Sequence, residues 1–178
     1  MVPDLIIGDL YSAEPDKVEA VKNQGVDVRK YPVEKNETDL ELALKAAQEF
    51  NADQVWVTGA LGNRIDQSLA NIFLIASPEF KALNLRLIDG QQEIFVIRHS
   101  KTINGEKGDR VSLLPLNGPV SGITTQGLYY PLDNETLTPH QTRGISNQMT
   151  RSESKVTIKD GLLLCIHESS SINERGEE

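Results

Sequence analysis

Residues 58–67 read T-G-A-L-G-N-R-I-D-Q and stand between an apolar, strand-like run and a helix-like run. In an open α/β sheet, ligands bind beyond the end of such a strand. The backbone at Gly59 and Gly62 can approach a phosphate closely, and Arg64 can bind one through two parallel hydrogen bonds. Asp66 would repel a phosphate unless a cation lay between them. The stretch therefore predicts a site for a metal–nucleotide complex.

Asp9 and Asp39 occupy similar places in the pattern. Asp9 follows the first apolar run, and Asp39 begins a helix-like run that Thr38 can cap. Because a parallel sheet brings the carboxyl ends of its strands to one edge, we expect Asp9, Asp39 and Asp66 to converge there. Converging carboxylates usually hold Mg²⁺, which also binds substrate phosphates. Simpler roles stay open: Asp9 can cap a turn, and Asp39 can interact with a helix dipole. Asp66 can form a surface ion pair with Arg64.

The first half of the chain alternates between strand-like and helix-like runs. Short apolar runs are typical of strands, and apolar residues three and four apart are typical of helices. The strand-like runs cover residues 4–7, 26–31, 54–57 and 85–88, and the helix-like runs cover residues 15–24, 38–50 and 65–76. This order predicts a Rossmann-like, three-layer α/β domain with a mostly parallel sheet over residues 1–91.

Helical spacing is lost after residue 91. Short strand-like runs are separated there by Gly, Pro and Asn turns, and they cover residues 93–97, 110–114, 122–127, 155–158 and 162–166. This pattern predicts an all-β sandwich or barrel over residues 92–178. The polar residues 168–178 are expected to form a frayed tail.

Composition narrows the class of protein. The chain has 178 residues and a net charge of −8, which argues against nucleic acid as a partner. Its single cysteine, Cys165, lies in an apolar run and is expected to be a buried, inert thiol, as in a reducing compartment. No signal peptide or membrane-spanning run is recognisable, so we expect a cytoplasmic protein with no membrane partner. His99, His140 and His167 show no metal-ligand spacing and are assigned no role.

Six stretches of the chain form a series. They are GDLYS (residues 8–12), TDLELAL (38–44), TGALGNRIDQ (58–67), TTQGLYYPL (124–132), GISNQ (144–148) and GLLL (161–164). In order and spacing these stretches resemble the motifs of the thiamine pyrophosphokinase family, across nearly the whole chain. Several motifs in register are far more specific than any one of them. There is no Walker-type G-K-[ST] loop, so a P-loop kinase is not expected.

The resemblance implies an enzyme that transfers a pyrophosphoryl group from ATP to the hydroxyl of thiamine, giving thiamine diphosphate and AMP. It implies a homodimer in which an α/β domain binds the nucleotide, and a β domain binds thiamine near the dimer interface. ATP is the implied co-substrate, and Mg²⁺ is the implied metal.

The resemblance also implies roles for particular residues. The implied catalytic residues are Asp9, Asp39, Asp66 and Arg64, of which Asp9 and Asp39 would bind Mg²⁺. The implied ATP-binding residues are Gly59, Gly62, Arg64 and Asp66. Ser146 and Asn147 match the pair that contacts thiamine, acting from the partner subunit. From the residues alone, this pair could instead close a turn, and Tyr129 and Tyr130 could either stack on a substrate or pack in the core.

The chain departs from the family pattern in three places. Tyr11 stands where the first motif has a second aspartate, which removes a carboxylate from the expected metal site. Asn63 replaces a glycine, a mild change because Asn tolerates left-handed backbone. Met1 lies a few residues before Asp9, whereas family chains carry another strand–helix–strand region there. The alternative is therefore a weak or inactive relative that binds thiamine or nucleotide, and a third hypothesis is a protein that kept only the fold.

Overall fold

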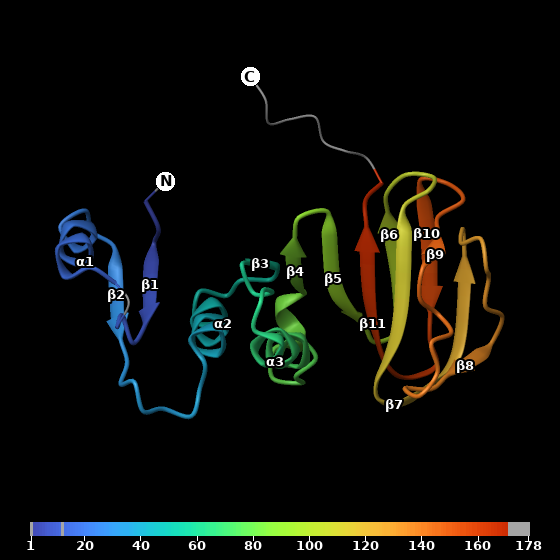
Figure 1. Ribbon diagram of the computed structural model, residues 1–178, viewed down its shortest axis with the longest axis horizontal. Coiled ribbons are helices and arrows are strands. Elements are labelled where there is room, and N and C mark those ends of the chain that lie inside the picture. Colours follow the sequence, from blue (N-terminus) through green and yellow to red (C-terminus); the bar gives the residue numbers. More distant parts are fainter. Residues whose placement is uncertain (1, 12, 171–178) are drawn as a thin grey trace, which may run out of the picture. The chain divides into compact units, whose positions relative to one another are not determined.

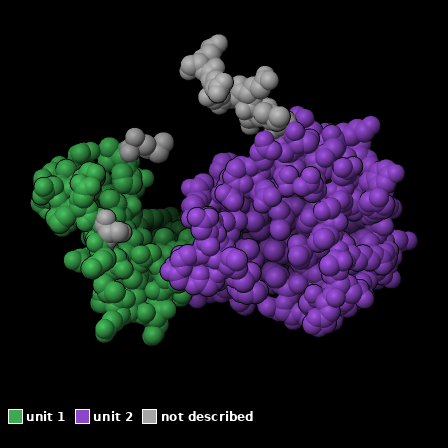
Figure 2. Space-filling view, in the orientation of Figure 1, with its two compact units in different colours: residues 1–53 green, residues 54–178 purple. Residues whose placement is uncertain are grey.

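The computed structural model describes residues 2–11 and 13–170. Met1, Ser12 of the first motif and residues 171–178 of the expected frayed tail lie outside the described residues. The chain divides into two compact units, residues 1–53 and residues 54–178 (Figure 2).

The first unit contains a parallel strand pair and two helices (Figure 1). Its elements are β1 (Leu5–Gly8), α1 (Pro15–Lys22), β2 (Asp27–Lys30) and α2 (Asp39–Glu49). α2 begins where the Thr38 hydroxyl accepts a hydrogen bond from the Glu41 N–H at 3.2 Å, which is the cap that the sequence predicts. The helix contacts β1 and buries Leu42, Leu44 and Ala46, whereas Phe50 at its C-terminal end is 57% exposed.

The second unit is built around one large sheet. Its elements are β3 (Val55–Thr58), α3 (Ile65–Ile75), the 3₁₀ helix η1 (Lys81–Leu83), β4 (Leu85–Asp89), β5 (Gln92–Ile97), β6 (Ser100–Asn104), β7 (Arg110–Gln126), β8 (Glu135–Leu137), β9 (Asn147–Gln148), β10 (Glu153–Thr157) and β11 (Asp160–Glu168). The strand order is β3-β4-β5-β11-β7-β10-β6, and β8 and β9 also pair with β7.

The predicted Rossmann-like parallel sheet is not confirmed. The parallel pairs, β1–β2 and β3–β4, belong to two separate sheets, and β4 continues into an otherwise antiparallel sheet through β5. The cause is the two-residue connection after Asp89, in which Gly90 has a φ of +57°. Such a connection forms a hairpin, and hairpin strands are antiparallel. The boundary predicted at residue 91 falls in this hairpin and stays a prediction.

β7 is much longer than the sequence suggested. Residues 110–114 and 122–127 were expected as two strands, because Pro115, Gly118 and Pro119 between them are typical of a turn. The strand instead runs through all 17 residues from Arg110 to Gln126. Its pairing with β11 shifts register between Asp160, which lies opposite Ser121, and Leu162, which lies opposite Leu116. This irregularity leaves residues 117–120 of β7 without a partner in β11.

The main core lies inside the β-rich part of the second unit. Its largest fully buried side chains include Ile97, Leu113, Ile123, Leu137, Met149 and Leu163. Cys165 is part of this cluster, and burial raises the pKa of its thiol, so the group stays protonated and unreactive as expected. Among the described residues, no helix is long and apolar enough to cross a membrane.

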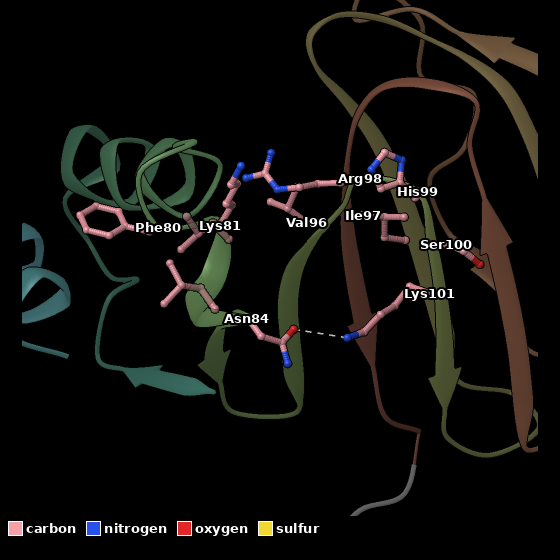
Figure 3. A pocket seen from close by; sticks show the side chains of 11 residues that line it. Phe80, Lys81, Asn84, Val96, Ile97, Arg98, His99, Ser100 and Lys101 are labelled. Atoms are coloured by element: carbon pink, nitrogen blue, oxygen red, sulfur yellow. Dashed lines mark hydrogen bonds between the residues drawn. The ribbon is translucent and has the colours of Figure 1, made fainter. Parts of the chain in front are cut away.

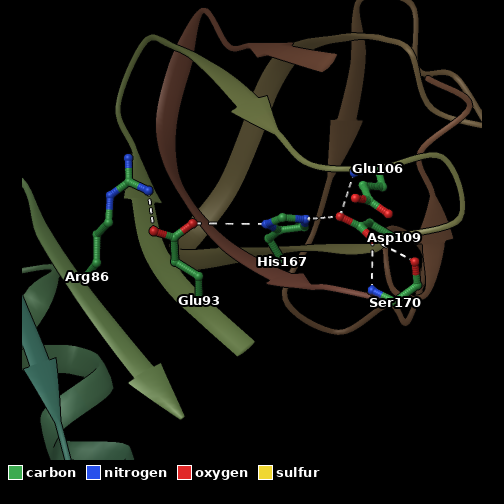
Figure 4. Close-up of polar contacts among 6 residues, drawn as sticks. All are labelled: Arg86, Glu93, Glu106, Asp109, His167 and Ser170. Atoms are coloured by element: carbon green, nitrogen blue, oxygen red, sulfur yellow. Dashed lines mark hydrogen bonds and ion pairs between the residues drawn. The ribbon is translucent and has the colours of Figure 1, made fainter. Parts of the chain in front are cut away.

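A buried polar network fixes the end of β11 to the β6–β7 connection (Figure 4). The Oδ2 atom of Asp109 lies 2.9 Å from Nε2 of His167, and its Oδ1 atom accepts hydrogen bonds from the backbone N–H and the hydroxyl of Ser170, each at 2.8 Å. On the other side, Nδ1 of His167 lies 4.0 Å from a carboxylate oxygen of Glu93, which pairs with Arg86. His167 therefore has a structural role that its sequence position did not reveal.

Candidate functional site

The loop between β3 and α3 forms the centre of the stretch at residues 58–67. A Cβ built on Gly59 or Gly62 would meet no heavy atom within 4 Å, so the backbone at both glycines faces open space. Gly59 has a φ of +70°, a conformation that other residues rarely adopt. Asn63 is not among the described residues with positive φ, so it occupies the family's glycine position without left-handed backbone.

Side chains of α3 hold this loop in place. The Ser68 hydroxyl accepts a hydrogen bond from the Gly62 N–H at 3.1 Å and lies 3.3 Å from the Gly62 carbonyl oxygen. Nδ2 of Asn71 donates to the Ala60 carbonyl at 2.7 Å. Ser68 and Asn71 were not predicted as site residues, although they lie about one turn from each other on α3, the helix that begins within the motif. The loop and these side chains surround a cavity of about 250 Å³.

Arg64 and Asp66 pair with each other at the mouth of this loop. Nη2 of Arg64 lies 2.5 Å from Oδ2 of Asp66, and Nε lies 3.2 Å from Oδ1, so the guanidinium grips the carboxylate with two hydrogen bonds. The contact lowers the pKa of Asp66 and raises that of Arg64. Both side chains are about two-thirds exposed, at 68% and 67%. An exposed pair of this kind adds little stability, so either side chain can exchange its partner for a ligand.

Asp9 and Asp39 lie at the carboxyl end of β1, in the first unit. A Cβ on Gly8 would meet Oδ2 of Asp39 at 2.9 Å, so the Asp39 carboxylate packs directly against the residue that precedes Asp9. Oδ1 of Asp9 accepts the backbone N–H of Tyr11 at 2.8 Å, which is the turn-capping role left open by the sequence. The structure thus brings these two predicted residues together.

Lys35 is a further charged group at this position. Its ammonium lies 2.9 Å from Oδ1 of Asp39, and its side chain is only 12% exposed. Sequence reasoning missed Lys35, although its spacing of four residues from Asp39 is a signal for such a pair. The Tyr11 side chain is 88% exposed, so its ring is not packed against the rest of the unit.

The donor set at the end of β1 suits Mg²⁺. Two aspartates offer hard oxygen ligands, and Mg²⁺ is commonly bound through one or two carboxylates with water and substrate phosphates completing its shell. In the part of the chain that the structure describes, no group of three or more His, Cys, Asp or Glu side chains could hold a metal. Asp9 and Asp39 would therefore share the ion with a phosphate ligand.

Ser146 and Asn147 lie where β9 pairs with β7. The carboxamide of Asn147 accepts the Tyr130 N–H at 3.0 Å and donates to the Tyr130 carbonyl at 2.7 Å, which places it in a structural contact. Ser146 is exposed, has a φ of +57° and donates its backbone N–H to the Ser112 hydroxyl at 3.0 Å. The pair thus closes a turn and presents the Ser146 side chain to solvent.

A cavity of about 420 Å³ lies beside this turn. Its wall combines apolar side chains with a few polar ones, as in typical small-molecule sites, and includes Leu113, Tyr130, Pro131, Leu132, Ile145 and Asn147. The rings of Tyr129 and Tyr130 meet edge to face with centroids 4.8 Å apart. They are 64% and 67% exposed, so they are not core residues and are available for stacking on a ligand.

Comparisons with known proteins point to one family. Residues 1–87 match the family model for the thiamin pyrophosphokinase catalytic domain, and residues 95–163 match the model for the thiamin pyrophosphokinase vitamin B1 binding domain. The chain is 29% identical to the thiamine pyrophosphokinase of Bacillus subtilis over 93% of its own length and 78% of the relative. It is 27% identical to thiamine pyrophosphokinase 1 of Oryza sativa subsp. japonica over 92% of its length and 66% of the relative.

The same similarity holds in three dimensions. The crystal structure of the Bacillus subtilis thiamine pyrophosphokinase superposes with a TM-score of 0.85 at 27% identity, covering 96% of this chain and 81% of that one. The thiamin pyrophosphokinase of Candida albicans superposes with a TM-score of 0.82 at 16% identity, covering 95% and 74%, which shows a shared fold.

Proposed function

The chain belongs to the thiamine pyrophosphokinase family, and from that premise we propose that it transfers the pyrophosphoryl group of ATP to the hydroxyl of thiamine. The products are thiamine diphosphate and AMP. The observation that carries this proposal is the β3–α3 loop, where the open backbone at Gly59 and Gly62 adjoins the Arg64–Asp66 pair. Backbone N–H groups and a guanidinium are the donors that a polyphosphate requires.

The reaction needs little covalent chemistry from the protein. The thiamine oxygen forms a bond to the β-phosphorus of ATP, the bond from that phosphorus to the α,β-bridging oxygen breaks, and AMP leaves with this oxygen. Catalysis then consists mainly of positioning and of stabilising charge on the phosphates. We assign the second task to Arg64, with the loop backbone holding the nucleotide. The proton of the thiamine hydroxyl passes to a carboxylate, and the candidates are Asp9, Asp39 and Asp66.

Asp9 and Asp39 would hold Mg²⁺, which when bound would neutralise negative charge on the phosphates. Lys35 already offsets the charge of Asp39. We propose that Asp66 also takes part in binding the metal–nucleotide complex at the β3–α3 loop, since its pairing with Arg64 is exposed and exchangeable. Release of Asp66 would free the Arg64 guanidinium to bind the nucleotide.

Thiamine is assigned to the β-rich part of the second unit. The cavity of about 420 Å³ suits a small organic ligand, and the exposed rings of Tyr129 and Tyr130 can stack on a flat, cationic one, because aromatic faces attract cations. Ser146 would contact the substrate directly, while Asn147 lines the cavity and holds Tyr130. We further propose a cytoplasmic homodimer in which the Ser146–Asn147 turn of each subunit serves the site of the other.

The test is an assay of the purified chain with ATP, Mg²⁺ and thiamine, in which thiamine diphosphate and AMP are separated by chromatography. We expect both products in equal amounts, and a loss of roughly a hundredfold or more in rate for Arg64→Gln, on the scale of one charge-stabilising donor. Asp160→Asn, which changes an exposed aspartate at the start of β11, is the matched control and should not change the rate. No product above the blank would refute the proposal, and thiamine binding without turnover would instead identify an inactive relative.

A further inference from the structure

A third cavity, of about 230 Å³, lies in the second unit away from the nucleotide loop (Figure 3). β3 and β4 run in parallel, with Val55 opposite Leu85 and Thr58 opposite Ile88. The loop that starts after Thr58 therefore lies at the carboxyl end of this pair. The third cavity includes Asn84 and Leu85, which lie at the amino end. It is thus separated from the nucleotide loop by the length of a strand.

The wall of this cavity is rich in positive charge. Its polar side chains are Lys81, Asn84, Arg98, His99, Ser100 and Lys101, and we call it the basic cavity. Arg98 contacts the backbone carbonyls of Ala76 and Ser77, and Lys101 contacts the side-chain amide of Asn84, so the hydrogen-bond partners of both cations are uncharged. Three cations gathered around one cavity stand out in a chain whose net charge is −8.

Arg98 is held in a fixed orientation. Its Nη2 atom donates to the carbonyl oxygen of Ala76 at 3.0 Å and approaches that of Ser77 at 3.4 Å, at the C-terminal end of α3. Figure 3 shows the side chain extended from β5 toward that helix. A guanidinium has five N–H donors, so Nε and Nη1 keep theirs for another acceptor. The C-terminal end of α3 thus orients the Arg98 guanidinium, which can bind an oxyanion through its remaining N–H groups.

Lys101 reaches into the cavity from β6. Its ammonium lies 3.4 Å from Oδ1 of Asn84 and 5.8 Å from the centre of the Phe95 ring. Asn84 has a φ of +41°, and this left-handed turn at the end of η1 aims its amide at the ammonium. Burial, and to a smaller extent Arg86, lowers the pKa of Lys101, while Glu93 opposes them. The charged form of Lys101 is therefore disfavoured by its surroundings, and an anion beside the ammonium would stabilise it.

We propose that the basic cavity binds a small phosphoanion, of the size of phosphate or pyrophosphate. Lys81, Arg98 and Lys101 would supply charge, and His99 and Ser100 would supply further hydrogen-bond donors. The volume of about 230 Å³ is below the range of roughly 300–1,000 Å³ that is typical of sites for larger organic ligands, so a complete nucleotide is not the occupant. The site is independent of the nucleotide loop and of the proposed transfer reaction.

The test is calorimetric titration of the full chain with sodium pyrophosphate and with sodium phosphate, in Mg²⁺-free buffer. All proteins carry Arg64→Gln, which weakens binding at the nucleotide loop and leaves the basic cavity intact. In this background we expect saturable binding, and Lys81→Gln and Lys101→Gln should each weaken it by roughly tenfold, the loss of one charge-assisted contact. Raising the salt concentration should weaken it further.

Lys155→Gln is the matched control. Lys155 lies on β10 opposite Thr102 of β6, is exposed, and does not line the basic cavity. Its loss removes the same charge from the same sheet, so the affinity should stay unchanged. Equal weakening by Lys155→Gln and Lys101→Gln would show a general charge effect and overturn the proposal. An absence of saturable binding in the Arg64→Gln background would overturn it as well, whatever the outcome of the transfer assay.

Discussion

Nε2 of His167 lies 2.9 Å from Oδ2 of Asp109, a contact that joins residues 58 positions apart in the chain. It ties the last strand of the sheet to the connection that precedes β7 (Figure 4). Asp109 is only 1% exposed, and a buried carboxylate is costly unless its oxygens are satisfied. Here both oxygens are satisfied, by His167, by Ser170 and by the backbone N–H of Glu106 at 2.9 Å. The network therefore stabilises the folded state, and protonation of the Asp109 carboxylate would weaken it.

Acid should weaken the protein through Asp109. Burial alone would raise the pKa of this carboxyl, but the hydrogen bonds from Ser170, Glu106 and His167 outweigh burial and lower it to about 2. A lowered pKa in the folded state stabilises the protein above the ordinary value near 4, and this stabilisation is lost as the pH falls toward 2. The shift corresponds to about 2 kcal/mol. Urea unfolding followed by far-UV circular dichroism at pH 6, 4 and 2.5 measures it.

The variant Asp109→Asn should remove the part of the stability that is lost in acid. We expect a loss of stability of about 2 kcal/mol at pH 6 and a smaller further loss between pH 4 and pH 2.5 than in the unmodified chain. Asp133→Asn, at an exposed position, is the control. If both variants lose the same stability on acidification as the unmodified chain, Asp109 does not carry the effect.

Gly105 should not tolerate a side chain. A Cβ at this position would lie 2.3 Å from Oδ2 of Asp109 and 2.8 Å from Nε2 of His167, which is inside van der Waals contact. Gly105→Ala should therefore push the two groups apart and cost about 1–3 kcal/mol of stability, as overpacking does. Thermal unfolding measures the loss. Gly62→Ala is the control, because a Cβ there meets nothing within 4 Å; an equal loss in both variants would contradict the steric explanation.

The contrast between local and long-range contacts explains what the sequence could predict. The helix from Asp39 was predictable because Thr38, Glu41 and the apolar spacing act within a few residues. The loop at residues 58–67 was predictable for the same reason. By contrast, Asp109 and His167 lie 58 residues apart in the chain, and they meet because β11 pairs with β7. No periodicity in the chain marks this contact.

The same reasoning accounts for the errors in the sheet. The sequence did not show that the connection at Gly90 joins β4 and β5 into an antiparallel hairpin, and a parallel sheet was expected instead. Pro115 and Pro119 suggested a break, yet their positions in β7 tolerate a missing N–H donor. At the site, Lys35 and Ser68 were missed because their importance arises from contacts with Asp39 and with Gly62.

Asn147 should affect the binding of thiamine by holding the backbone of Tyr130 in place. Its carboxamide satisfies both backbone groups of Tyr130, so Asn147→Ala removes two partly buried hydrogen bonds, at a cost of about 1–3 kcal/mol. We expect a lower melting temperature and a higher KM for thiamine, with a smaller change in KM for ATP. Ser146→Ala removes an exposed hydroxyl and should raise the KM for thiamine at an unchanged melting temperature. If Asn147→Ala leaves the KM for thiamine unchanged, the Tyr130 segment does not form the thiamine site.

Tyr11→Asp tests whether the metal site lacks a ligand. The Tyr11 side chain is 88% exposed, and its backbone N–H already holds Asp9, so the replacement should disturb neither the core nor this turn. A carboxylate beside Asp9 and Asp39 would add a hard oxygen ligand. We expect the Mg²⁺ concentration at half-maximal rate to fall by roughly tenfold, on the scale of one charge-assisted contact. Tyr11→Asn, which is neutral and of similar size to Asp, should leave this concentration unchanged. An equal response to both replacements would mean that the ring, and not the missing carboxylate, limits the site, and would count against Asp9 and Asp39 as the metal ligands.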